Sequence, residues 1–227
     1  MGMIYMTHAQ VLETIKKEKL IAILRGIPFE KTEKVVEALL EGGVKVLEFT
    51  FDHEIENCIE ENCLKIERTR SVFAHQALVG CGTLLTAKEA ETAQKAGASF
   101  AISPNTDREV IECVKKLGMV SIPGAFTPTE IVDAFRYGAD IVKLFPAGDL
   151  GAKYIKSVRA PLKHIPIAAV GGVKPENLKD FLDAGVCGLG VGGQLVLSDA
   201  VKNNDYAALT ARAKAFTDAI REWEENR

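Results

Sequence analysis

The sequence has little of what marks membrane, secreted or nucleic-acid-binding proteins. It contains no apolar run of about 18 residues, the length that a membrane-spanning helix needs. Its beginning lacks the apolar core of a secretory signal. The 28 Lys and Arg residues are outnumbered by 31 Asp and Glu residues, which gives a net charge of -3 and no basic footprint for nucleic acid. We therefore expect a cytoplasmic protein with no membrane or nucleic-acid partner.

Cysteine and histidine are also sparse. The five cysteines are an odd number and form no Cys-x-x-Cys pair, which argues against a disulfide framework and favours a reducing compartment. Cys58 and Cys63 are close in sequence, but no second close pair or histidine partner accompanies them, so a zinc site is not expected. The histidines are scattered: His8, His53, His75 and His164. The sequence thus predicts neither a metal nor another cofactor.

Short apolar runs alternate with longer helical patterns along the chain of 227 residues, of which 47% are apolar. The runs recur at spacings of 21 to 32 residues, enough for one strand, one helix and two short loops. Eight consecutive strand–helix units predict an α/β fold, a compact (β/α)8 TIM barrel. The runs begin near Leu20, Lys45, Ala77, Ala98, Met119, Asp140, Pro166 and Cys187.

The remaining segments fit this architecture. Apolar residues recur at helical spacing over residues 31–40, 109–117 and 207–223, and glycines stand where several helices would end. An open doubly wound sheet is the alternative, but no Gly-x-Gly-x-x-Gly turn follows the first run. We expect a single domain over residues 1–227, made of an N-terminal helix (1–19), a barrel core (20–197) and a C-terminal helix (198–227).

Three charged residues interrupt the apolar runs. Strands covered on both sides are nearly continuous in apolar residues, because a buried charge is costly unless it is paired. Arg25, Glu48 and Lys143 each lie toward the C-terminal end of a run, the end at which barrels carry their chemistry. Strand alternation turns Leu47 and Phe49 toward the helices, which aims Glu48 into the barrel. The three charges can therefore converge at one mouth.

An inward lysine and glutamate suit carbonyl chemistry. Desolvation lowers the pKa of a buried lysine, and its neutral amine can attack a carbonyl to form a Schiff base. A nearby carboxylate can carry the protons. A lone lysine at a strand end more often extends to solvent, but three charged residues at one face favour an active site.

Two glycine pairs follow the seventh and eighth runs, Gly171 with Gly172 and Gly192 with Gly193. Glycines also simply make tight turns, so that the pairs alone do not define a site. Their position after the last two strands is where barrels commonly hold phosphate on exposed backbone N–H groups.

These features together resemble the class I 2-keto-3-deoxy-6-phosphogluconate (KDPG) and 4-hydroxy-2-oxoglutarate (KHG) aldolases. The resemblance extends in unbroken order from about residue 20 to residue 197. Its segments are residues 21–25 (IAILR), 47–50 (LEFT), 80–84 (GCGTL), 102–105 (ISPN), 122–124 (IPG), 143–147 (KLFPA) and 171–173 (GGV).

The resemblance implies a role for individual positions. Lys143 matches the lysine that forms the Schiff base, and Glu48 matches the general acid and base. Four further residues match substrate-binding positions of the family: Arg25, Thr83, Pro104 and Phe145. The phosphate loop matches Gly171, Gly172, Gly192 and Gly193. The family is typically a homotrimer, which the resemblance implies here as well.

The chain also departs from the best-known members at three positions. Many have an arginine two residues after the threonine of the second strand, where this sequence has Asp52 followed by His53. Carboxylate binding would then fall to Thr83 with backbone donors, or to Arg25. Gly193 and Val170 replace a common serine and threonine of the phosphate loop.

The activity that the resemblance implies is cleavage of KDPG to pyruvate and glyceraldehyde 3-phosphate. Segments such as AVGGVKPENL look closer to the branch that acts on 2-keto-3-deoxy-6-phosphogalactonate (KDPGal), the C4 epimer. KHG is another alternative substrate. A different phosphate-binding barrel isomerase or synthase, or a non-catalytic binding protein, is the alternative outside the family's activity.

Overall fold

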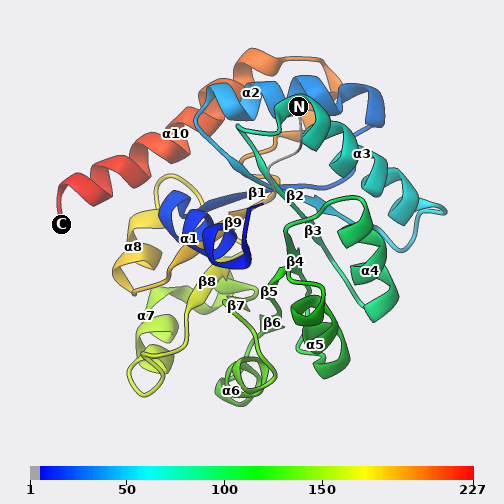
Figure 1. Ribbon diagram of the computed structural model, residues 1–227. Coiled ribbons are helices and arrows are strands. Elements are labelled where there is room, and N and C mark those ends of the chain that lie inside the picture. The colour runs from blue at the N-terminus through cyan, green and yellow to red at the C-terminus, as the bar shows by residue number, and fades with distance from the viewer. Residues whose placement is uncertain (1–5) are drawn as a thin grey trace.

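The computed structural model describes residues 6–227, which form an α/β barrel (Figure 1). Nine parallel strands build one sheet in the order β5-β4-β3-β2-β1-β9-β8-β7-β6. The strands are β1 (Leu20–Leu24), β2 (Val46–Thr50), β3 (Leu78–Gly82), β4 (Phe100–Ile102), β5 (Val120–Ile122), β6 (Gly124–Ala125), β7 (Val142–Leu144), β8 (Ile167–Val170) and β9 (Gly188–Val191). The predicted TIM-type barrel is confirmed.

The ninth strand arises because the fifth apolar run is divided at Pro123. A proline has no N–H to donate, so the run changes partners there. Before it, β5 pairs with β4, and after it, β6 pairs with β7. The Pro123 carbonyl still accepts a hydrogen bond of 2.8 Å from the N–H of Lys143. The two edges of the sheet thus belong to one run, which brings the barrel to near closure.

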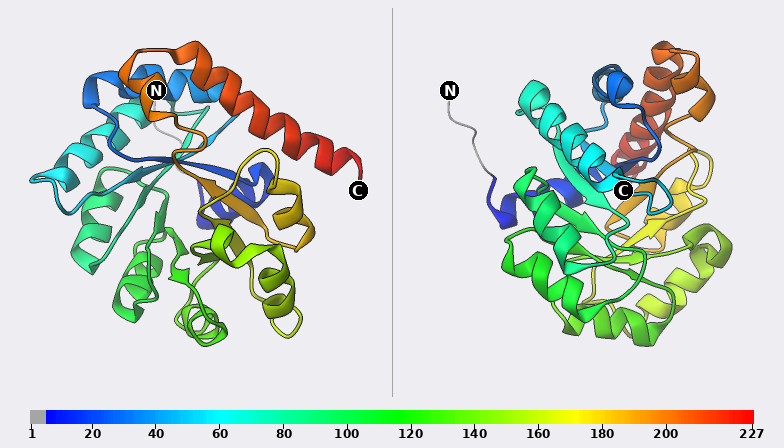
Figure 2. Two further views of the ribbon diagram at one scale, coloured as in Figure 1. Left: turned by 180° about the vertical axis from the view of Figure 1, so that it is seen from behind. Right: turned by 90° about the vertical axis from the view of Figure 1, so that its right-hand side faces the viewer.

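Helices surround the strands and connect them, as both views of Figure 2 show. The helix α1 precedes the first strand and α10 follows the last one. The helices are α1 (His8–Glu18), the 3-10 turn η1 (Phe29–Lys31), α2 (Thr32–Glu41), α3 (Cys58–Phe73), α4 (Ala87–Lys95), α5 (Arg108–Lys116), α6 (Pro128–Arg136), α7 (Ala147–Arg159), α8 (Leu178–Asp183), α9 (Ser198–Lys202) and α10 (Tyr206–Glu225). No helix within residues 6–227 is both long and apolar enough to cross a membrane.

Local sequence sets both ends of these helices. Thr7, Thr86 and Thr127 each accept a hydrogen bond from the backbone of the first turn, in complete capping boxes. After α2 and α5 the chain turns back through Gly43 and Gly118 with φ of 88° and 76°, a conformation that glycine adopts without steric cost. The predicted glycine ends of helices are therefore present, and they keep the connections to the next strand short.

Strand alternation divides the apolar core into two layers. Leu47 and Phe49 belong to the outer layer, between the sheet and the helices, whereas Val46 belongs to the layer inside the barrel. Val11 and Ile15 of α1 join this inner layer. The N-terminal helix therefore closes the end of the barrel at which the strands begin, and the opposite end is left for chemistry.

Candidate active site

The C-terminal ends of four strands bring the predicted polar residues together. Glu48 lies within β2 and Lys143 within β7, while Arg25 and Thr83 follow β1 and β3 directly. Glu48 is 2% exposed and Lys143 is 8% exposed, whereas Arg25 is open to solvent. The two buried charges thus point inward, and the exposed guanidinium lies at the mouth above them.

Glu48 sits in a tight and incompletely satisfied pocket. Its Oε1 accepts a hydrogen bond of 3.1 Å from the Thr50 hydroxyl, two residues further along the same face of β2. Its Oε2 is buried and accepts no hydrogen bond from any residue between 6 and 227. A buried carboxylate oxygen without a hydrogen bond costs free energy. Oε2 is therefore the oxygen available to accept a hydrogen bond from a substrate or a water molecule.

Lys143 lies beside an aromatic ring and forms no direct ion pair within the described residues. Its Nζ lies 4.8 Å from the centroid of the Phe145 ring. Within the part of the chain that the structure describes, Lys143 forms no direct ion pair with an acidic residue. The amine is therefore not locked by a salt bridge, which leaves it available for reaction.

Burial shifts the pKa values of the two inner groups in opposite directions. Loss of hydration raises the pKa of Glu48, and the charges of Lys143 and Arg25 and the Thr50 hydrogen bond offset this only in part. Loss of hydration likewise lowers the pKa of Lys143, against the attraction of Glu48, and the Arg25 charge lowers it further. Both shifts thus act toward the uncharged forms of the two neighbouring groups.

A glycine on the neighbouring strand β3 makes room for the Glu48 carboxyl group. Gly82 is the register partner of Thr50 on the neighbouring strand, and a Cβ atom added to it would lie 1.6 Å from Glu48 Oε1. Only a residue without a side chain fits there, because the Glu48 carboxyl group is enclosed.

We expect Gly82→Ala to destabilise the fold by about 1–3 kcal/mol, because the methyl group would force Glu48 out of its pocket. The matched control is Gly188→Ala in β9, where an added Cβ makes only ordinary contacts of 3.7 Å and longer. The free energies of unfolding, measured in urea, should separate the two variants. Equal stability of both would contradict the steric role of Gly82.

Arg25 and Thr83 meet at the rim of the barrel. The Arg25 Nη2 donates a hydrogen bond of 3.4 Å to the Thr83 hydroxyl. Thr83 has a φ of 59°, an unfavourable conformation for a β-branched residue and one that is concentrated at functional sites. Pro104 follows β4 at the same end, and its carbonyl oxygen would lie 2.2 Å from a Cβ on Gly124.

The segment after β2 contains no arginine, and its polar side chains bond to other groups. The Asp52 Oδ1 accepts a hydrogen bond from the Glu54 N–H, at 3.2 Å. The His53 Nε2 lies 3.1 Å from Glu89 Oε1 on α4. Neither side chain pairs with Arg25, whose charge acts on both Glu48 and Lys143.

The two glycine turns enclose a cavity of about 230 Å³ at the ends of β8 and β9. Phe145 closes one side of it and Ile23 of β1 another. Residues 192–196 form a single turn in which the N–H groups of Leu195 and Val196 donate to the Gly192 carbonyl. This turn does not continue as a helix: the first helix after β9 is α9, which begins at Ser198.

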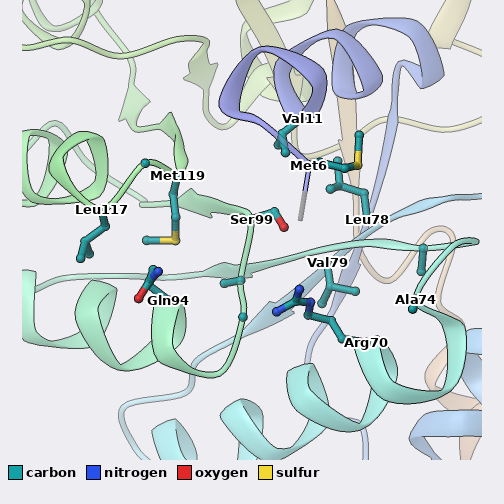
Figure 3. A pocket seen from close by; sticks show the side chains of 14 residues that line it. Met6, Val11, Arg70, Ala74, Leu78, Val79, Gln94, Ser99, Leu117 and Met119 are labelled. Atoms are coloured by element: carbon teal, nitrogen blue, oxygen red, sulfur yellow. The ribbon is translucent and has the colours of Figure 1, made fainter. Parts of the chain in front are cut away.

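A second cavity lies at the opposite end of the barrel, where the strands begin (Figure 3). It has a volume of about 180 Å³ and is lined mainly by apolar side chains, among them Val11 of α1 and Met119. The polar side chains in this view are Arg70, Gln94 and Ser99. None of the predicted site residues lies there, so the two ends of the barrel are chemically distinct.

A model of the family described as KDPG and KHG aldolase matches residues 11–212. The chain belongs to the KDPG and KHG aldolase family. Among its relatives, a 2-dehydro-3-deoxy-6-phosphogalactonate aldolase of Escherichia coli K12 is 32% identical over 90% of this chain and 97% of its own length. A probable aldolase of the same type from Rhizobium meliloti is 38% identical over 78% of this chain and 81% of its own length.

Solved structures of aldolases have the same fold. A native KDPGal structure superposes with a TM-score of 0.81 and 33% identity, over 91% of this chain and 96% of that one. A KDPG aldolase from Legionella pneumophila, with pyruvate captured as a covalent carbinolamine, has a TM-score of 0.81 and 26% identity, over 93% of this chain and 98% of that one. The protein is therefore an aldolase-family lyase on a TIM-type barrel.

Sequence reasoning missed two contributors to this candidate site. Thr50 shares a strand face with Glu48, so alternation could have identified its hydroxyl as a partner. The clearance at Gly82 had no signal in the sequence, because it depends on the register between β2 and β3.

Proposed function

We propose that the protein is a Schiff-base aldolase that cleaves a phosphorylated 2-keto-3-deoxy sugar acid to pyruvate and glyceraldehyde 3-phosphate. The observation that carries this proposal is a buried lysine beside a buried glutamate: among the described residues, the lysine has no salt bridge and one glutamate oxygen has no hydrogen bond. The pyruvate carbinolamine captured in the Legionella relative supports the same chemistry here.

In the proposed mechanism, the neutral amine of Lys143 attacks the C2 carbonyl of the substrate. Glu48, whose pKa burial raises, donates a proton to the carbinolamine hydroxyl, which leaves as water and gives the iminium. The carboxylate then accepts the proton of the C4 hydroxyl, directly or through water, while the C3–C4 bond breaks. The electron pair of this bond moves into the iminium and forms an enamine, while glyceraldehyde 3-phosphate leaves. Protonation of the enamine and hydrolysis then release pyruvate.

The remaining predicted residues hold the two ends of the substrate in this proposal. Arg25, with Thr83, binds the carboxylate of the keto acid, and Pro104 and Phe145 line the pocket. The phosphate lies against the backbone N–H groups of the turns at Gly171, Gly172, Gly192 and Gly193. Glycines support this role because they let an anion approach the backbone closely.

The substrate that the resemblance implies is KDPG, and its C4 epimer KDPGal is the alternative. The similarity to two phosphogalactonate aldolases and to the native KDPGal structure supports the epimer. Comparing kcat/KM for the two epimers and for KHG, with one enzyme preparation, decides between them. One hydroxyl group distinguishes the epimers, and a tenfold preference between them corresponds to a difference of about 1.4 kcal/mol in transition-state binding.

The direct test of the proposed function is borohydride reduction in the presence of pyruvate. We expect the intact mass to rise by one reduced pyruvate, and peptide mapping to place it on Lys143. No adduct on the folded protein, with a working control aldolase, would overturn the Schiff-base proposal. Loss of cleavage activity upon chelation would instead favour a metal-dependent isomerase or synthase, and ligand-induced stabilisation without turnover a binding protein.

We expect Arg25→Gln to raise KM for the keto acid by about ten- to hundredfold, because a charge-assisted bond to its carboxylate is lost. The Arg25 charge also lowers the pKa of Lys143, so its removal should shift the pH dependence of pyruvate trapping toward higher pH. The control is Arg25→Lys, which keeps the charge and should keep the pH profile. An unchanged KM in Arg25→Gln would exclude this role.

The homotrimer that the resemblance implies stays a prediction. Light scattering coupled to size-exclusion chromatography gives the mass of the assembly, and a mass of one or two chains would contradict it.

A further inference from the structure

The turn after β9 exposes unpaired backbone donors to the cavity between the two glycine pairs. Gly192, Gly193 and Gln194 line this cavity, and their N–H groups donate to no acceptor within the residues that the structure describes. In contrast, the N–H groups of Leu195 and Val196 donate back to the Gly192 carbonyl, at 2.8 and 2.9 Å. The turn therefore resembles the first turn of a helix, with its free donors at the start.

The orientation of this turn is held by a side chain from the last helix. The Nε of Arg212 on α10 donates a hydrogen bond of 2.6 Å to the Gln194 carbonyl. In a planar trans peptide the carbonyl and the following N–H point in opposite directions. Binding the Gln194 carbonyl therefore directs the Leu195 N–H toward Gly192, which keeps the turn closed and its first N–H groups free.

Arg212 is itself firmly placed. Its guanidinium stacks at 5.3 Å from the centroid of the Phe216 ring, one turn further along α10. Phe216 is fully buried, and Thr217 donates a hydrogen bond of 2.8 Å to the Gly42 carbonyl at the end of α2. Ala213 packs so closely on Gly42 that a Cβ there would lie 2.3 Å away. The helix therefore holds the guanidinium at a fixed position relative to the barrel.

Arg212 also supplies an uncompensated charge. In the described part of the chain it pairs with no carboxylate, whereas Arg221 on the same helix pairs with Asp218 at 2.8 Å. The other glycine turn is held by a neutral group, since Asn177 Nδ2 donates to the Gly172 carbonyl at 3.0 Å. The charged side chain that bonds one of the two glycine turns thus comes from α10.

We propose that Arg212 is a positioning residue for the phosphate group of the substrate. It holds the turn of residues 192–196 so that its free N–H groups face the phosphate, and it adds positive charge behind the Gln194 carbonyl. This inference rests on the proposed function, because it names a residue that orients the phosphate-binding turn of the same site.

The test compares Arg212→Gln with Arg212→Lys and with Arg221→Gln, the matched control on α10. We expect Arg212→Gln to raise KM for KDPG or KDPGal about tenfold and to weaken inhibition by inorganic phosphate by a similar factor. The value of kcat, and KM for the unphosphorylated KHG, should stay within about twofold. Arg212→Lys should recover part of the loss, and Arg221→Gln should behave as the wild type.

Two outcomes would overturn the inference: an unchanged KM for the phosphorylated substrate in Arg212→Gln, or an equal rise in KM for KHG, which marks a general structural defect. Thermal unfolding of each variant identifies such a defect independently. Pyruvate trapping on the wild-type enzyme keeps this test separate from the proposed function. Trapping with an unaltered KM in Arg212→Gln refutes the role of Arg212 alone, whereas absent trapping refutes the aldolase mechanism.

Discussion

Replacing Lys143 with alanine is expected to abolish pyruvate trapping and to lower kcat by about 10⁴-fold or more, as removal of a covalent nucleophile commonly does. The reason is chemical, because without the amine no iminium forms, and the electron pair of the C3–C4 bond has no acceptor. Single-turnover cleavage assays and borohydride trapping measure the two losses separately.

The sharper version of this experiment is Lys143→Arg. Arginine keeps a positive charge and the stacking on Phe145, but its guanidinium does not lose its proton and forms no Schiff base. If Lys143 served only to bind an anion, the arginine variant would retain substantial activity. We expect it to be as inactive as the alanine variant. The control is Lys174→Ala, an exposed lysine just beyond the first glycine turn, which should keep trapping intact.

Replacing Glu48 with glutamine is expected to lower kcat by about 10²- to 10⁴-fold, the usual contribution of a general acid and base. Glutamine preserves the volume beside Gly82 and can still accept the Thr50 hydrogen bond, but it carries no transferable proton. Dehydration of the carbinolamine and deprotonation of the C4 hydroxyl should both slow. Rapid-quench measurements of iminium formation and of bond cleavage show which step is limiting.

The same substitution should increase stability at neutral pH. Burial raises the pKa of Glu48 above its ordinary value of 4.5, so the folded state holds this proton more tightly than the unfolded chain. The stability linked to Glu48 is therefore fully present below the unfolded pKa and is lost as the pH rises through the folded pKa. Glu48→Gln removes that loss, so its Tm should exceed the wild-type Tm near pH 7, and the difference should shrink as the pH falls below 4.5.

This comparison of Tm values distinguishes a catalytic carboxylate, which lowers stability, from a carboxylate that stabilises the fold. A lower Tm for Glu48→Gln at pH 7, together with near-normal kcat, would show that Glu48 is a structural partner of Lys143 instead. The control is Thr50→Val, which removes the hydroxyl that bonds Glu48 Oε1 and leaves the carboxyl group in place. We expect it to alter the pH dependence of kcat while retaining most of the maximal rate.

Local patterns in the sequence were sufficient to predict the barrel. The spacing of the apolar runs and the glycines that end helices both act over a few residues, and they indicate the same strand–helix repeat. Alternation along a strand then predicted the inward direction of Glu48 and Lys143, since side-chain direction in a strand depends only on position. The structure has both residues buried and pointing inward.

The turn at residues 192–196 shows where such reasoning stopped. The glycine pair predicted a turn here, but not that the Gly192 carbonyl accepts two N–H groups in a single closed turn. The contact that holds this turn comes from Arg212, 18 residues further along the chain. A contact between a loop and a distant helix has no periodic signature in the sequence.

The sequence by itself determined the number of strand–helix units and which charged residues lie at the C-terminal ends of the strands. Tertiary structure alone decided how the barrel closes at Pro123, that Gly82 leaves space for the Glu48 carboxyl group, and that Arg25 meets Thr83 at the mouth. The physical reason is the separation along the chain of the residues that determine each feature. Strand and helix periodicity arises from neighbouring residues, whereas the clearance, the free Oε2 and the pKa shifts depend on the packing of segments that are distant in the chain.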